Sequence, residues 1–200
     1  MRLRWFRSTP LAAARWVVLD CETSGLDATR DRLLSVGAVT VRAGRIALGS
    51  AFEARVRQET PSARENILVH GLGADAQRAG RPGEEVIAAL AAYAADAVPV
   101  AFHAPFDAEV LRRHGLRLGG WIDLARLAPA LFPQERRRTL DEWLAAFGIE
   151  PVARHDAAGD ALAAAELLLA LLGEAKRQRL ETVEALVKAE RSGRWLAAPA

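Results

Sequence analysis

The sequence has one cysteine and no long apolar run. Cys21 has no partner for an internal disulfide, which indicates a reducing compartment. No apolar stretch reaches the ~18 residues that a membrane-spanning helix needs. Because Arg15 interrupts the apolar run near the N-terminus, a signal peptide is not predicted either. We therefore expect a cytoplasmic protein without a membrane partner.

Lysine is also scarce. Of 27 basic residues, all but Lys176 and Lys188 are arginine, and the net charge is +2. The planar guanidinium suits phosphate contacts, although coding bias produces the same excess of arginine. With 51% apolar and 26% charged residues, the 200-residue chain has the composition of a globular protein that buries one core. We predict a basic arm at 1–14, one main domain at 15–173, and a C-terminal helix and tail at 174–200.

The apolar pattern alternates between strand and helix signals. Buried or alternating runs predict strands at 16–20, 33–41, 45–56 and 98–103, with a short one in the segment "GWID" at 120–123. Helical signals cover 83–97, 106–115, 139–148, 157–172 and 174–191, while 61–83 resembles a loop with short helical turns. This order predicts an α/β fold, with a mixed five-stranded sheet flanked by helices.

The first strand ends in two acids, in the segment "VVLDCETSGLD" at 17–27. Side chains alternate along a strand, so Asp20 and Glu22 share one face and Cys21 faces the core on the other side. Two carboxylates on one face at the end of an apolar strand cost stability unless something binds them.

Two further acids stand near the starts of predicted helices. Asp107 follows the strand at 98–103, and Asp160 lies at the start of the helix after "RHDAAG". Each alone is more often an acid that favours the helix dipole. Ligand sites of open α/β sheets gather at strand ends, however, so the four acids are expected to converge.

Four converging carboxylates need compensation. At separations of roughly 4 Å, each pair costs about 4 kcal/mol at an effective dielectric constant near 20. Two divalent cations offset the four charges, and hard oxygen ligands suit Mg²⁺ or Mn²⁺. Such a metal pair is the usual device for hydrolysing a phosphodiester.

A histidine supplies the remaining chemistry. An attacking water needs a proton acceptor, and an imidazole with a pKa near ~6.5 serves at neutral pH. His155 lies five residues before Asp160, which on one helix is about 140° around the axis. We therefore predict that His155 lies on a loop and that the helix begins after it. Taken alone, a loop histidine is more often a surface residue.

Three segments carry a family resemblance. "DCETSG", "FDAEVL" and "HDAAGDA" resemble, in order and spacing, the motifs of the DnaQ-like (DEDDh) 3′-to-5′ exonucleases, which include the DNA polymerase III epsilon subunit. The segments at 67–72, 121–133 and 139–150 extend the likeness from about residue 15 to residue 173.

The resemblance implies a ribonuclease H-like fold and release of nucleoside 5′-monophosphates from a 3′ end. It implies two metal ions held by the four acids, with His155 as general base. It also implies that Thr23, His70 and Phe106 hold the 3′-terminal nucleotide. The chain departs from the family at Phe102-His103, where His-Asn is common.

Other functions stay open. DNA with a single-stranded or frayed 3′ end is the favoured partner, and an RNA-trimming enzyme like oligoribonuclease is the alternative. A catalytically silent nucleic-acid-binding module would be expected to have lost an acid or the histidine, yet all five are present. A purely structural subunit leaves the acids unexplained. The sequence is compatible with a polymerase or repair partner, but no residue identifies that partner.

Overall fold

A mixed sheet forms the centre of the molecule. The computed structural model describes residues 9–192, and its sheet has the order β3-β2-β1-β5-β6, with β4 also paired to β2. β1 (Arg15–Thr23) pairs antiparallel with β2 (Leu33–Arg42) and parallel with β5 (Val98–Ala101). β6 (Ile122–Asp123) extends the parallel part of the sheet. The predicted α/β architecture, a mixed sheet flanked by helices, is confirmed.

The predicted number of strands was wrong, because the third strand is interrupted. β3 (Arg45–Ile46) and β4 (Phe52–Arg55) both pair with β2, but a short 3₁₀ helix, η1 (Leu48–Ser50), separates them. This segment contains Gly49 and Ser50 and has no β-branched residue, so it has little preference for a strand. The sheet consequently has six strands, where five were predicted.

Helices surround the sheet. Their bounds are α1 (Arg64–His70), α2 (Ala74–Arg78), α3 (Gly83–Tyr93), α4 (Ala104–Arg113), α5 (Leu124–Leu131), α6 (Leu140–Ala146), α7 (Ala157–Arg177) and α8 (Val183–Ser192). Thr139 caps α6 with a capping box. α4 begins two residues before the predicted start, since Pro105 fits the first turn of a helix. Among the described residues, no helix is both long enough and apolar enough to cross a bilayer.

The end of α7 differs from the prediction. A new helix was expected from residue 174, but α7 continues through Gly173 to Arg177 and α8 begins at Val183. Ala175 is fully buried in the core, which offsets the cost of about 1 kcal/mol for a glycine inside a helix. The division predicted between 173 and 174 therefore falls inside α7, and the domain limits stay a prediction. Residues 1–8 of the predicted arm lie outside the described residues.

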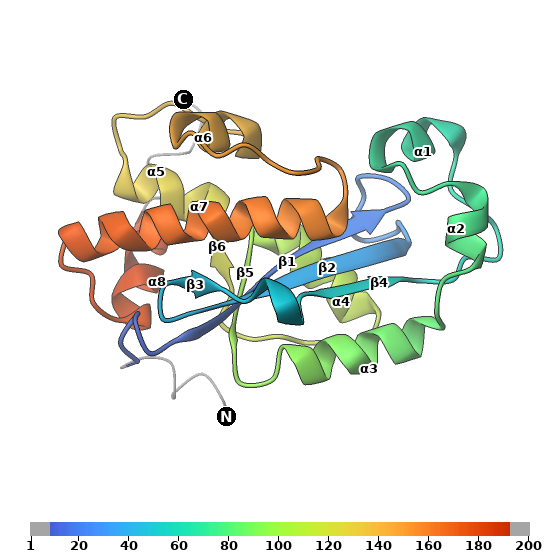
Figure 1. Ribbon diagram of the computed structural model, residues 1–200, viewed down its shortest axis with the longest axis horizontal. Helices are drawn as coiled ribbons and strands as arrows, with labels where there is room; N and C mark the ends of the chain where they lie inside the picture. The colour runs from blue at the N-terminus through green and yellow to red at the C-terminus, as the bar shows by residue number, and fades with distance from the viewer. Residues whose placement is uncertain (1–8, 193–200) are drawn as a thin grey trace.

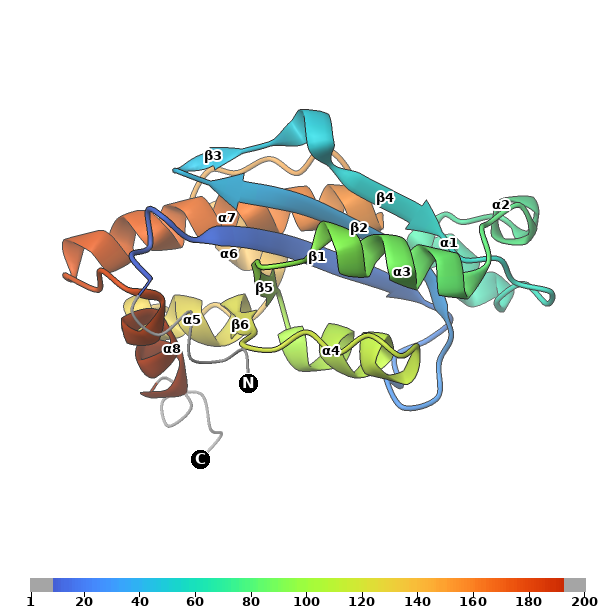
Figure 2. The same ribbon diagram turned by 90° about the horizontal axis from the view of Figure 1, so that it is seen from below.

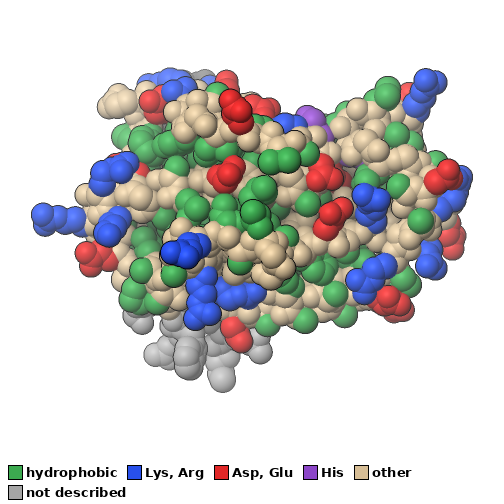
Figure 3. Space-filling model, in the orientation of Figure 1, with side chains coloured by type: hydrophobic (Ala, Val, Ile, Leu, Met, Phe, Trp, Pro, Cys, Tyr) green, Lys and Arg blue, Asp and Glu red, His purple; other side chains and the backbone are tan. Residues whose placement is uncertain are grey.

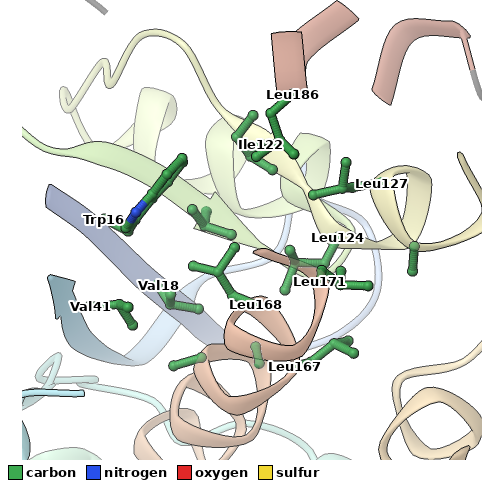
Figure 4. Close-up of a cluster of buried hydrophobic side chains, with 14 of the residues drawn as sticks. Trp16, Val18, Val41, Ile122, Leu124, Leu127, Leu167, Leu168, Leu171 and Leu186 are labelled. Carbon is green, nitrogen blue, oxygen red and sulfur yellow. The ribbon is translucent and has the colours of Figure 1, made fainter. Parts of the chain in front are cut away.

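The sheet separates two apolar layers. Figures 1 and 2 show α7 across one face of β1 and β2, with α3 and α4 on the opposite side. On the α7 face, Trp16 and Val18 pack with Leu168 in a cluster that α5 and α8 also enter (Figure 4). Val17 and Leu19 belong to the cluster on the α3–α4 face. Because strand side chains alternate, Asp20 and Glu22 lie on the α7 face.

A glycine lets the N-terminus of α7 approach the sheet. Gly37 of β2 is the register partner of Asp20. A Cβ added at Gly37 would lie 2.3 Å from the backbone carbon and oxygen of Ala157, the first residue of α7. The close backbone approach brings Asp160, in the first turn of that helix, toward the acids of β1.

Candidate metal centre and active site

Three of the predicted acids come together. Asp20 and Glu22 from β1 and Asp160 from α7 each offer a carboxylate oxygen, and these atoms lie within 4.8 Å of one another. Asp160 is buried, while Asp20 and Glu22 are partly buried. Oxygen donors of this kind and spacing fit a hard divalent cation. The donor set therefore suits the kind of metal that the sequence predicts.

Asp107 lies outside this group of three. It is buried in the first turn of α4, and its carboxylate is hydrogen-bonded by the Cys21 side chain. α4 packs on the opposite face of the sheet from α7, with Val110 and Leu111 in the same cluster as Cys21. Asp107 therefore approaches β1 from the side of Cys21. Its charge still acts on Asp20, whose pKa it raises.

The electrostatics of the cluster favour a bound proton or a bound cation. Burial raises the pKa of Asp20 well above its usual value, and the charges of Asp107 and Glu22 raise it further. Burial also raises the pKa of Glu22, followed by the charge of Asp156. The Arg154 guanidinium opposes these effects and lowers the pKa of both carboxyls. The Arg154 guanidinium thus relieves only part of the repulsion among the acids.

The shift at Asp107 predicts a pH dependence of stability. Burial raises the pKa of Asp107 to about 7, whereas an unfolded aspartate titrates near ~3.9. Between these values the folded chain holds a proton that the unfolded chain releases. Stability without divalent cations is therefore expected to fall as the pH rises from about 4 to about 7, by up to about 1.4 kcal/mol per pH unit for this proton.

Urea unfolding in EDTA at several pH values measures this dependence. The Asp107→Asn variant keeps the size of the side chain but cannot titrate, so its unfolding midpoint is expected to change less with pH. If the unfolding midpoints of the variant and the parent changed equally with pH, Asp107 would not be the source of the pH dependence.

Both oxygens of Asp160 have partners within the chain. Oδ1 accepts from the Arg154 guanidinium, and Oδ2 accepts from the backbone N–H of His155 at 3.1 Å. The Nε of Arg154 also donates to Asp141 Oδ1 of α6, at 2.6 Å. These bonds fasten the loop before α7 to the carboxylate cluster.

His155 lies on a loop, as predicted. α7 begins at Ala157, and Asp156 caps it by accepting from the backbone N–H of Gly159 at 2.9 Å. The φ of His155 is +58°, a left-handed conformation that directs the chain into the helix. The side chain is exposed, so the imidazole is open to solvent beside a helix N-terminus that carries Asp160. This placement suits a proton acceptor that is not itself a metal ligand.

Two of the residues predicted to hold a nucleotide lie in accessible positions. The Thr23 hydroxyl donates to the carbonyl of Gly25 at 2.6 Å, just after β1. Phe106 is partly buried and lines a hollow of about 380 Å³ together with Pro105 and Arg126. That hollow does not take in the three carboxylates.

The third such residue, His70, faces inward. Its Nδ1 accepts from the backbone N–H of Leu72 at 3.0 Å, and its Nε2 lies 3.3 Å from Ser62 Oγ. Burial lowers its pKa, which favours the neutral ring with the proton on Nε2. Both ring nitrogens are thus occupied within the chain. α1 stands at the end of the sheet where β1 ends (Figure 1), and the Asn66 side chain donates to the carbonyl of Ser24.

Four charged residues near the site were missed at the sequence level: Asp123, Asp141, Arg154 and Asp156. Asp123 Oδ1 accepts from the backbone N–H groups of His103 at 3.0 Å and Ala125 at 3.1 Å, so it fastens the turn that leads into α4. That turn carries the departure at Phe102-His103, and the two rings meet edge to face. The only sequence signals for these residues were helix N-terminal positions and, for Arg154, adjacency to His155.

Basic side chains do not form a single patch on the face that carries α7. Figure 3 shows arginine and lysine side chains spread over this face, with acidic side chains between them. Some basic side chains of the described residues pair with an acid of the same helix, such as Arg177 with Glu174 and Lys188 with Glu184. The electrostatics of the site are therefore set by the charges next to the carboxylates more than by the overall potential of the surface that carries α7.

Known proteins resemble the chain in sequence. A model of the RNase_T family, described as Exonuclease, matches residues 17–168. A DNA polymerase III subunit epsilon-like protein of Rhodobacter capsulatus is 35% identical over 198 residues, covering 94% of this chain and 28% of that protein. A PolC-type DNA polymerase III of Thermotoga maritima is 29% identical over 162 residues, covering 78% of this chain and 12% of that protein. The chain thus spans a minor part of these relatives.

Solved structures share the fold. Exonuclease X in complex with 5′ overhanging duplex DNA has a TM-score of 0.71 and 22% identity, covering 88% of this chain and 99% of that one. Escherichia coli exonuclease I in complex with a dT13 oligonucleotide has a TM-score of 0.68 and 20% identity, covering 84% of this chain and 42% of that one.

Proposed function

We propose, on the premise that this chain belongs to the exonuclease family, that it hydrolyses terminal phosphodiester bonds of DNA from the 3′ end and releases nucleoside 5′-monophosphates. The observation that carries the proposal is the meeting of Asp20, Glu22 and Asp160 within 4.8 Å at the N-terminus of α7, next to the exposed His155. Three carboxylates so close together, and flanked by an imidazole, suit hydrolysis of a phosphodiester at neutral pH.

Each residue has a distinct role in this proposal. Asp20, Glu22 and Asp160 would hold two Mg²⁺ or Mn²⁺ ions, and Asp107 would complete the set from the α4 side. The ions would supply positive charge that offsets the carboxylates and the charge that develops on the phosphate. His155 takes the proton from the attacking water. Its backbone bond to Asp160 keeps the imidazole close to the metal ligands while leaving the ring free.

The 3′-terminal nucleotide is proposed to bind between β1 and α4. Thr23, the last residue of β1, and Phe106, one residue before Asp107, are both placed to contact it. His70 would act indirectly, because its buried bonds to Ser62 and Leu72 hold the end of α1 in shape. DNA is proposed before RNA because the related structures hold DNA.

The partner and the location are also proposals. The likeness to a DNA polymerase III subunit epsilon-like protein and to a PolC-type DNA polymerase III supports a role next to a polymerase or repair protein. The single cysteine supports the cytoplasm as the place of action.

Labelled oligonucleotides test the proposal. Single-stranded DNA and RNA of one sequence, each labelled at the 5′ end, are incubated with the protein and Mg²⁺ or with EDTA. A ladder of DNA products shortening from the 3′ end, only with metal, is the expected result. A ladder on RNA alone would favour the RNA-trimming alternative, and binding without cleavage would favour a silent module.

A histidine variant tests the proton acceptor. His155→Ala is expected to lower the cleavage rate by about 10²–10⁴-fold, because the attacking water loses its general base. Calorimetric titration is expected to show unchanged Mn²⁺ binding, since the ring is not a ligand. His114→Ala, at the far end of α4, is the matched control and should retain the parental rate. Loss of Mn²⁺ binding in the His155 variant would show that the role is wrongly assigned.

A further inference from the structure

We infer that the Arg154 guanidinium is an internal counter-ion that competes with divalent cations for the Asp160 carboxylate. When a cation displaces the guanidinium from Asp160, Asp141 remains its second charged partner. This inference rests on the proposed metal site. It goes beyond that site by naming Arg154 and Asp141 as the residues that set its affinity for divalent cations. Neither residue is one of the acids or the histidine that the exonuclease motifs supply.

The contacts place the guanidinium between two helices. Arg154 donates to Asp160 Oδ1 from Nη1 and to Asp141 Oδ1 from Nε. Its side chain is 24% exposed, the Asp160 side chain is 9% exposed, and the Asp141 side chain is 64% exposed. Arg154 thus joins a buried carboxylate of the metal cluster to a solvent-facing carboxylate of α6.

The charge of Arg154 acts on the whole cluster. It lowers the pKa of Asp20 and of Glu22. Because the guanidinium is also bonded to Asp160, its charge acts on all three carboxylates that would hold metal. A divalent cation among these carboxylates carries the same sign of charge as the guanidinium, and the two repel each other across a few ångströms. Asp160 Oδ2 is already engaged by the backbone of His155. A cation that takes Oδ1 therefore displaces the bond from Arg154 Nη1.

Asp141 makes this displacement easier. Because the Nε bond to Asp141 does not involve the metal cluster, the guanidinium keeps one charged partner when it leaves Asp160. The bond lies toward solvent, where a shift of the side chain needs no opening of the core. Removing Arg154 should consequently strengthen metal binding, and removing Asp141 alone should weaken it.

If Arg154 only supports the metal site, its removal is expected to change the Kd for metal in the opposite direction. If the guanidinium only orients Asp160 for the metal, its loss weakens metal binding. Measurements at about pH 8 keep proton competition small, so that the two roles differ in the direction of the change in Kd.

Calorimetric titration of the full chain with Mn²⁺ alone, at pH 8, distinguishes them. Arg154→Gln is expected to lower the Kd about tenfold, a change that corresponds to about 1.4 kcal/mol. Asp141→Asn is expected to raise the Kd severalfold. Asp141→Asn in the Arg154→Gln background is expected to change nothing further, because Asp141 acts only through Arg154.

A matched control separates local from general charge effects. Arg177→Gln removes one positive charge at the far end of α7, where Arg177 is 70% exposed and pairs with Glu174. This variant should bind Mn²⁺ as the parent does. Circular dichroism of every variant confirms that it is folded.

The Mn²⁺ affinities of these variants test the inference without a measurement of cleavage. Unchanged or weaker binding by Arg154→Gln, or no Mn²⁺ binding by the parent, would overturn it. A persisting effect of Asp141→Asn without the arginine would overturn the role of Asp141. Since no substrate is present, a protein that shows these shifts but leaves DNA intact would contradict the proposed function alone.

Discussion

Asp20→Asn is expected to lower the rate of 3′-end shortening about a thousandfold or more, because the variant loses a carboxylate that faces both Glu22 and Asp160. The same substitution is expected to raise the thermal unfolding midpoint in EDTA. Burial and the neighbouring acids raise the pKa of Asp20, so its ionised form destabilises the folded chain at neutral pH. A neutral amide of the same size removes that cost.

Activity and stability thus change in opposite directions, and the two are measured separately. The rate comes from the labelled DNA strand with Mg²⁺, and the midpoint comes from circular dichroism in EDTA. Asp75→Asn is the control, since Asp75 on α2 is fully exposed and, among residues 9–192, its side chain pairs with Arg78 of its own helix alone. If Asp20→Asn lost activity only in proportion to unfolded protein, Asp20 would have no place in the chemistry.

Gly37→Ala is expected to destabilise the protein by about 1–3 kcal/mol, because the new methyl group overlaps the backbone of α7. A Cβ at Gly37 lies 2.3 Å from the carbonyl of Ala157, and neither backbone can yield without a shift of the helix. Such a shift moves Asp160 away from Asp20 and Glu22. Misplacement of a ligand by about 1 Å is expected to cost about a hundredfold in rate.

Urea unfolding and the cleavage assay measure these two effects. Gly49→Ala is the matched control, because a Cβ there meets no atom within 4 Å and the residue lies in the exposed η1 segment. That variant should retain the parental stability and rate. If Gly37→Ala behaved like Gly49→Ala, the close approach of α7 to β2 would not be what assembles the site.

Local patterns in the sequence were sufficient to predict much of the site. Alternation along β1 placed Asp20 and Glu22 on one face, and in the structure this face lies under α7. Helical periodicity placed His155 before the helix, and α7 begins two residues later. Both predictions depend on the backbone geometry of a few consecutive residues, and this geometry does not depend on the rest of the fold.

Contacts between distant segments could not be predicted in this way. The split between β3 and β4 depends on which parts of the segment find a partner on β2, and the continuation of α7 past Gly173 depends on burial of Ala175. Arg154 and Asp141 are thirteen residues apart and come together only because α6 packs beside the start of α7.

The sequence by itself determined the residue types of the candidate site, the face of β1 that carries two of them, and the loop that carries His155, since these follow from local backbone geometry. Only the tertiary structure decided that Asp107 meets Cys21 from the far face, that Gly37 admits the end of α7, and that Arg154 bonds to Asp160. The physical reason is that such contacts depend on how packed layers approach one another, which no short stretch of the chain encodes.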